Sequence, residues 1–170
     1  MSICDLLPDL VECTDFAKYN EYRSQLYEIF LDTFVNHSVI WDGKVVAVNT
    51  APEEDGLMKG FTHITGRKYS KSKKRYPDFR RSERILWIKP MIEASIDICP
   101  SCVDNLLCDG VKIWTRPFKN QLRTVFLLEE QSYVVIIEER PHHYQLITAF
   151  YIDDDNEMND FLNSYDKYKN

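Results

Sequence analysis

The chain has 170 residues, of which 44% are hydrophobic and 28% are charged, and its formal net charge is −6. This length and balance are typical of one globular domain, residues 1–170, and exclude a disordered or collagen-like chain. No apolar run approaches the roughly 18 residues of a membrane-spanning helix, and residues 1–10 contain no cationic leader. Five cysteines, an odd number, indicate reduced thiols. We therefore expect a cytoplasmic protein without a membrane partner.

The N-terminal region, residues 1–40, is expected to be helical. Thr14 and Asp15 are good capping residues, because an oxygen-bearing side chain accepts hydrogen bonds from the free amides of a first helical turn. Apolar side chains then recur with the period of one helix face, at Phe16, Tyr19, Leu26, Tyr27, Phe30, Leu31 and Phe34. The pattern predicts one amphipathic helix over residues 15–36.

The next part of the chain predicts a hairpin and two loops. Short β-prone runs flank the turn signal Asp42-Gly43, which indicates a hairpin over residues 38–48. Residues 49–60 are rich in Pro, Gly and acid and predict a surface loop. Residues 66–79 are too cationic and polar to bury, and within them residues 71–74 predict a mobile, exposed loop.

The remaining elements complete an α+β domain. Residues 82–93 predict a helix that begins at Ser82 and is distorted at Pro90. Four runs dense in β-branched and aromatic residues predict strands joined by short turns: residues 111–114, 121–128, 133–138 and 143–152. An acidic C-terminal helix follows at residues 153–170. The sequence therefore predicts N-terminal helices, a four-stranded antiparallel sheet and a C-terminal helix.

Cationic side chains gather in residues 67–89. This segment carries ten cations and two acids, a net charge of +8, whereas the rest of the chain is acidic. A focused positive patch on an anionic body favours an anionic ligand, although a charge run is more often only a solvated face. The candidate ligand-binding residues here are Arg67, Lys73, Lys74, Arg75, Arg80 and Arg81.

His63 lies just before this basic segment. Histidine exchanges a proton near neutral pH, and arginine forks match two phosphate oxygens, so together they supply what phosphodiester cleavage needs. The alternative is a structural histidine, hydrogen-bonded between Phe61 and Ile64.

Two other sets of residues are weaker candidates for chemistry. His142 and His143 adjoin the last predicted strand, where neighbouring side chains point to opposite faces and do not readily bind one metal ion. Thr148 lies in that strand, and alternation puts it on the face of Leu146 and Phe150, as a core hydroxyl or a functional group.

A zinc site at the cysteines is a further hypothesis. Cys99, Cys102 and Cys108 form a single C-x-x-C and one more thiol. Structural zinc takes four ligands, so a histidine or another cysteine would have to complete the set. We expect no metal and no cofactor.

Three motifs occur in order: Gly60-Phe61-Thr62-His63-Ile64-Thr65, Arg80-Arg81-Ser82-Glu83-Arg84-Ile85-Leu86-Trp87, and the closing Leu146-Ile147-Thr148-Ala149-Phe150-Tyr151. With them the region 41–152 resembles the phage-associated branch of the barnase, EndoU, colicin and RelE-like nuclease superfamily. The resemblance implies a toxin-like, metal-independent endoribonuclease that cleaves RNA, with tRNA as a candidate substrate, to a 2′,3′-cyclic phosphate. Its sheet carries the active site on an open face.

The resemblance also implies roles for individual residues. His63 is the acid or base, Arg84 holds the phosphorane oxygens, and Thr148 fixes the phosphate or the histidine, with Tyr151 as a neighbour. In this scheme His142 or His143 is a second proton carrier. A cognate antitoxin or immunity protein is an expected partner.

The alternative function is a non-catalytic RNA- or protein-binding module, such as a phage-derived regulator or inhibitor. It would dock through the basic segment 67–89 by charge complementarity. A third hypothesis is a structural domain stabilised by zinc at the three cysteines.

Overall fold

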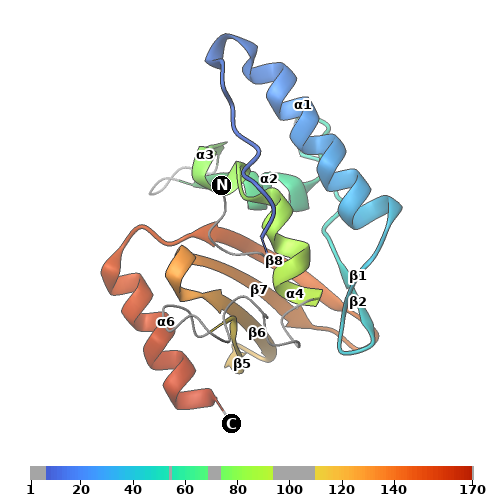
Figure 1. Ribbon diagram of the computed structural model, residues 1–170. Helices are drawn as coiled ribbons and strands as arrows, with labels where there is room; N and C mark the ends of the chain where they lie inside the picture. Colours follow the sequence, from blue (N-terminus) through green and yellow to red (C-terminus); the bar gives the residue numbers. More distant parts are fainter. Residues whose placement is uncertain (1–6, 54, 69–73, 94–109, 170) are drawn as a thin grey trace.

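A computed structural model describes residues 7–53, 55–68, 74–93 and 110–169 of the chain. A six-stranded mixed sheet and a separate two-stranded ribbon are combined with helices (Figure 1). The α+β class predicted from the sequence is confirmed. The strand count and the pairing are not those predicted.

Four strands of the large sheet form an antiparallel meander. They are β5 (Lys112–Phe118), β6 (Gln121–Leu128), β7 (Tyr133–Glu139) and β8 (Tyr144–Tyr151). They lie side by side in chain order, and each pairs antiparallel with the next. The four predicted strands are therefore present, because β-branched and aromatic side chains pack well on a pleated surface and short joints keep successive strands adjacent.

A hairpin adds two more strands to this sheet. It consists of β1 (Val39–Trp41) and β2 (Lys44–Ala47), as the Asp42-Gly43 turn predicts. However, β2 pairs in parallel with the first residues of β8, with Val46 opposite Tyr144. The prediction of a four-stranded antiparallel sheet was therefore wrong, since the hairpin joins the meander through a long-range parallel pairing.

The predicted N-terminal helix is present as three continuous pieces. They are the 3₁₀ turn η1 (Phe16–Lys18), α1 (Tyr19–Phe30) and the π-helical turn η2 (Leu31–Asn36). The carboxylate of Asp15 accepts a hydrogen bond from the Ala17 amide and so caps the start, as predicted.

The helix predicted over residues 82–93 is instead divided into α3 (Phe79–Ser82), the 3₁₀ turn η3 (Ile85–Trp87) and α4 (Ile88–Glu93). It begins at Asp78, whose carboxylate accepts from the Arg81 amide, and not at Ser82. Ser82 is buried, and its hydroxyl donates to the carbonyl of Thr65. Pro90 lies in the first turn of α4, where a missing N–H costs little.

The cationic segment 66–79 contains the two-stranded ribbon. Strands β3 (Gly66–Lys68) and β4 (Arg75–Pro77) pair antiparallel, and residues 69–73 lie outside the described ranges. Of the predicted loop 71–74 only Lys74 is described, and its side chain is exposed. Backbone pairing and the arginine contacts below order the rest of the described segment.

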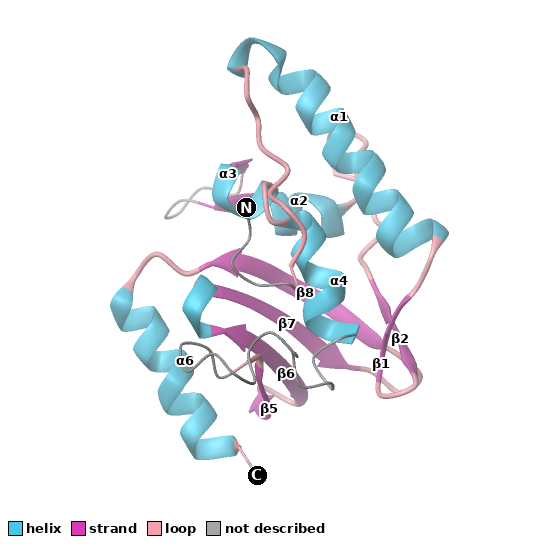
Figure 2. Cartoon of the chain, in the orientation of Figure 1, coloured by secondary structure: helices cyan, strands magenta, loops and turns pink. Residues whose placement is uncertain are grey.

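Side chains on the two faces of the large sheet form two cores. Helices α1, α2 (Lys59–Thr65) and α4 pack on one face around residues such as Phe30, Phe61 and Tyr133. On the other face the 3₁₀ turn η4 (Glu129–Gln131) links β6 to β7, and α6 (Asp155–Tyr168) covers Trp114 and Ile136. Figure 2 shows α6 apart from the other helices. The predicted C-terminal helix is confirmed, and it begins after the capping residue Asp154.

Candidate functional site

Helix α2 carries His63 and packs beside β8. Strand β2 reaches only the start of β8, so the rest of that edge is adjacent to the helix. Gly60 lets the helix begin close to the chain after β2, because an added Cβ would lie 3.1 Å from both the Asn49 oxygen and the Val48 Cβ. The position of His63 is therefore set by the sheet.

The acidic loop before α2 is fixed at both ends. The Gly60 amide donates to the Asn49 carbonyl at 2.8 Å, and the Glu53 amide donates to the Leu57 carbonyl at 2.8 Å. An ion pair of 2.9 Å between Arg23 and Asp55 ties the loop to α1. These contacts hold the Glu53 carboxylate beside α2, with Oε1 at 3.5 Å from the hydroxyl of Thr62.

His63 contacts Arg75 of β4. The Nη2 atom of Arg75 lies 3.2 Å from Nδ1 of His63, and Nη1 of Arg75 donates to the Gly66 carbonyl at 3.1 Å. Burial lowers the pKa of both side chains, and the charge of the nearby Glu53 carboxylate opposes this shift. A carboxylate, an imidazole and a guanidinium thus share one half-buried place on the molecule.

Burial and then the Arg75 charge lower the pKa of His63 to about 4. The imidazole is therefore neutral at physiological pH. A guanidinium can only donate, so Nδ1 accepts from Arg75 and the ring proton lies on Nε2. In this state the ring of His63 can donate a hydrogen bond through Nε2–H. It cannot accept a second one, because the lone pair on Nδ1 already accepts from Arg75.

Arg81 fixes the C-terminal end of α2. Its Nη1 atom donates to the carbonyls of His63 at 3.3 Å and Gly66 at 3.1 Å, and its Nε atom lies 3.6 Å from Asp78. The last carbonyls of a helix lack partners within the helix and carry partial negative charge, which a cation satisfies. Arg81 therefore positions His63 through its backbone.

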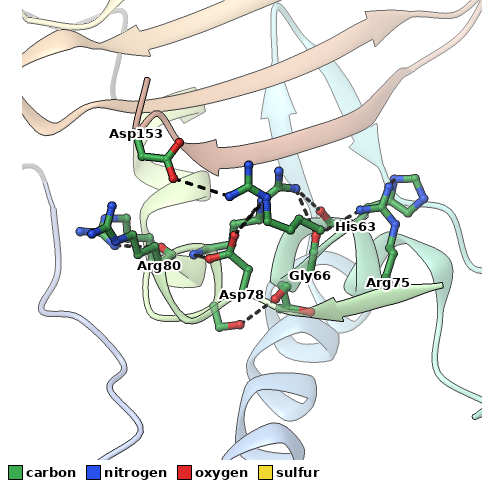
Figure 3. A network of polar contacts seen from close by, with 11 residues as sticks. His63, Gly66, Arg75, Asp78, Arg80 and Asp153 are labelled. Carbon is green, nitrogen blue, oxygen red and sulfur yellow. Dashed lines mark hydrogen bonds and ion pairs between the residues drawn. The ribbon is translucent and has the colours of Figure 1, made fainter. Parts of the chain in front are cut away.

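Arg67 extends this network toward α6. Its guanidinium lies 3.9 Å from Asp78 and 3.6 Å from Asp153, the residue that follows β8 and Ile152. Figure 3 shows Asp153 and Asp78 on one side of the network, and the pair of Arg75 and His63 on the other. The network joins the ribbon, α3 and the end of the large sheet.

Arg84 and Arg80 lie at the end of β8. The Arg84 guanidinium is 4.7 Å from the centre of the Tyr151 ring and 5.1 Å from that of Trp87, and Arg80 lies 5.0 Å from the Tyr151 ring. Arg84 also donates to Glu83 at 2.5 Å and to the Arg80 carbonyl at 2.8 Å. The arginine predicted to hold phosphate is thus stacked between aromatic rings and paired with a carboxylate.

Tyr133 lies behind Arg84 in the core. Its ring meets Trp87 edge to face at 5.5 Å, and its hydroxyl is fully buried. Neither this hydroxyl nor the buried Nε of Arg84 has a hydrogen-bond partner among the described residues. Burial raises the pKa of Tyr133, so its hydroxyl keeps its proton and remains a donor.

Thr148 is not on the predicted face of β8. A bulge in the pairing with β7 places Ile136 opposite Thr148 and Ile137 opposite Leu146, which leaves Ile147 as the extra residue. Leu146 belongs to the core under the N-terminal helices, whereas Phe150 belongs to the core under α6. Thr148, two residues before Phe150, shares the α6 face, so the prediction that it shares a face with Leu146 was wrong.

The other predicted residues are spread over the molecule. Tyr151 lies on the face of the N-terminal helices, opposite to that of Thr148. His142 and His143 lie in the turn before β8, about 25 Å or more along the strand from Tyr151. Lys74 is exposed beside Arg75, and Lys73 lies outside the described residues.

Cys99, Cys102 and Cys108 also lie outside the described residues, so the zinc hypothesis stays a prediction. In the described ranges, no three His, Cys, Asp or Glu side chains are grouped in a way that could hold a metal ion. Within the same ranges, no helix is long and apolar enough to cross a membrane.

Comparison with known proteins gives no assignment. No protein family model, no curated protein and no solved structure matches the chain. The function is therefore inferred from the geometry of the site.

Sequence reasoning missed Glu53 and Asp78. Glu53 lies in a segment that reads only as an acidic loop, and its contact with α2 is made by folding. Asp78 has a detectable signal, because Asp-x-x-Arg at a helix start is typical of a capping residue. Both supply the negative charge that holds the cationic segment in place.

Proposed function

We propose that the chain is a metal-independent endoribonuclease whose reacting groups are Glu53, His63 and Arg75. The observation that carries the proposal is the contact of Arg75 with Nδ1 of His63 beside the Glu53 carboxylate. Attack of a ribose 2′-hydroxyl on its own phosphate needs a base and donors for the phosphorane oxygens. This cluster offers a carboxylate and two kinds of donor.

The reaction proceeds by an in-line displacement. Glu53 accepts the proton of the 2′-hydroxyl, the 2′-oxygen forms a bond to phosphorus, and the bond from phosphorus to the 5′-oxygen breaks. The 5′-oxygen takes a proton from a water molecule, and the hydroxide left by that water takes the proton back from Glu53. The products are a 2′,3′-cyclic phosphate and a 5′-hydroxyl end, and Nε2–H of His63 and the Arg75 guanidinium donate to the non-bridging oxygens.

This scheme gives His63 a different role from the acid or base that the resemblance implies. An imidazole with a pKa of about 4 carries no exchangeable cationic proton at neutral pH. A neutral imidazole still donates a directed hydrogen bond, in a half-buried place where such a bond is stronger than in water.

The surrounding cations attract the RNA backbone. Lys68 and Lys74 are exposed on the ribbon that carries Arg75, and Arg80 is exposed on α3. Attraction of this kind is independent of sequence and weakens as salt rises. An acidic antitoxin or immunity protein would bind to the same surface. We also propose that the enzyme acts in the cytoplasm.

Incubation of the purified protein with total RNA and tRNA in EDTA tests the proposal. We expect fragments that end in a 2′,3′-cyclic phosphate, and a large loss of cleavage in His63→Ala. His37→Ala is the matched control, because His37 is exposed at the end of η2. Intact RNA with the wild-type protein, or equal cleavage by His63→Ala, would contradict the proposal.

A second candidate is a non-catalytic RNA-binding module. Arg75, Arg81 and Arg67 of the basic segment already contact carbonyls or carboxylates. These contacts favour a fixed binding surface over mobile reacting groups. Such a module would bind RNA and leave it intact, and His63→Ala would retain its affinity.

A further inference from the structure

Four aromatic rings meet where α1 and α3 approach each other. The Phe79 ring lies at the centre, with its centroid 5.3 Å from that of Phe16, 5.9 Å from Tyr19 and 6.3 Å from Tyr22. The contacts with Phe16 and Tyr19 are edge to face, and that with Tyr22 is stacked. Tyr22 is buried, so the cluster is anchored in the core.

The outer part of this cluster faces solvent. Phe16 is 72% exposed and Phe79 is 37% exposed, although both are large apolar side chains. Single exposed apolar residues are ordinary, but two phenylalanines in contact with each other form a small apolar surface. We call Phe16 and Phe79 the aromatic platform.

The platform adjoins the candidate site through α3. Phe79 and Arg81 are two residues apart on this short helix, so their side chains leave it on nearly opposite sides. Phe79 contacts α1, while Arg81 donates to the carbonyl of His63. The platform and the reacting cluster are therefore held on two sides of one element.

Two exposed cations lie next to the platform in the sequence: Lys18 is two residues after Phe16, and Arg80 follows Phe79. The acids in this region have partners: Asp15 accepts from the Ala17 amide, and Asp78 accepts from the Arg81 amide and faces Arg67. Burial raises the pKa of Tyr22, and the nearby Glu83 carboxylate, which is paired with Arg84, adds to this shift. Exposed rings among cations are the combination by which proteins bind single-stranded nucleic acid, since every base has a face that can stack.

We propose that the aromatic platform stacks an unpaired base of the RNA strand whose backbone lies at the Glu53, His63 and Arg75 cluster. This inference rests on the proposed function and names its substrate class, which is single-stranded or looped RNA. A duplex would not serve, because its bases are stacked on one another and are not free to meet Phe16 and Phe79.

Binding of an uncleavable strand tests the proposal. Fluorescence anisotropy measures the affinity for an unstructured 2′-O-methyl RNA and for an abasic strand of the same length. The ratio of the two affinities is the preference for a strand that carries bases. We expect Phe16→Ala and Phe79→Leu to reduce this preference roughly tenfold, in line with the loss of one stacked base. Phe16→Tyr should retain the preference, and Phe118→Ala is the matched control, because its ring is also 37% exposed but lies in β5.

The outcomes separate the two proposals. If the wild-type protein cleaves RNA but Phe16→Ala keeps the full preference for bases, the platform does not stack a base and the inference is wrong. If the wild-type protein neither binds nor cleaves RNA, the proposed function itself has failed. Because the readout is a ratio of two affinities, partial unfolding of a variant does not imitate the expected result.

Discussion

Nη2 of Arg75 lies 3.2 Å from Nδ1 of His63, and this contact joins the ribbon to the helix beside β8. It uses the lone pair of the imidazole and places a positive charge next to it. The first consequence is that His63 does not act as a cationic acid near neutral pH. The second is that Arg75 and His63 present their remaining N–H groups in a fixed geometry.

The pKa of His63 can be measured by an NMR titration of its imidazole. We expect a value near 4, caused by burial first and by Arg75 second. In Arg75→Gln the pKa should rise toward the ordinary 6.5 without reaching it, because burial remains. His63→Gln identifies the resonance, and a value unchanged by Arg75→Gln would show that the two side chains are not in contact.

The same shift predicts how stability depends on pH. In the unfolded chain the pKa of His63 returns to its ordinary value, so between about 4 and 6.5 the unfolded state binds a proton that the folded state does not. This contribution to the free energy of unfolding is therefore complete above that window and is lost as the pH falls through it. Urea unfolding at both ends of the window should show a smaller pH effect in His63→Gln than in the wild type, and an equal effect would contradict the assignment.

Arg81→Gln tests the capping of α2. The side chain of Arg81 is 14% exposed and donates hydrogen bonds to the carbonyls of His63 and Gly66. Its loss leaves these acceptors without their donor, which should lower the free energy of unfolding by about 1–3 kcal/mol in urea denaturation. Lys68→Gln removes an exposed cation of the same segment and should change stability by less than about 0.5 kcal/mol. Equal effects of the two variants would mean that Arg81 has no special structural role.

Gly66→Ala tests the close approach of the two ribbon strands. An added Cβ would lie 2.8 Å from the Tyr76 carbonyl oxygen and 3.2 Å from that of Thr62, and both of these are backbone atoms. The ribbon must therefore move away from α2, at a cost of about 1–3 kcal/mol in the free energy of unfolding. Because Arg75 lies in the displaced strand, RNA cleavage should fall as well. A variant as stable as the wild type would show that the strands are not packed this closely.

The meander could be predicted from sequence because its information is local. Runs dense in β-branched and aromatic residues mark the strands β5 to β8, and short turns determine which strands are neighbours. The parallel pairing of Val46 with Tyr144 has no such signal, since it depends on how the hairpin meets a strand far along the chain. The bulge at Ile147 is equally invisible, and it reverses the face of Thr148.

The candidate site was predicted in part. The residue types were found, since His63, Arg75 and Arg81 do lie together. What the sequence did not reveal is what the arginines contact: carbonyls at the end of α2, and Asp78. Nor did it reveal that residues 59–65 are helical, because Gly60, Thr62 and Thr65 are poor helix formers and packing against β8 decides the conformation.

The most direct test of the account is single-turnover cleavage of a short unstructured RNA in EDTA by Glu53→Gln. This change removes the proposed base, while the backbone bonds that hold the residue in its loop remain. Glu28→Gln, in the exposed part of α1, is the matched control. The account predicts a rate that is 10²–10⁴-fold lower for Glu53→Gln, as expected for loss of a general base, and an unchanged rate for Glu28→Gln. Cleavage by Glu53→Gln at the wild-type rate would contradict it.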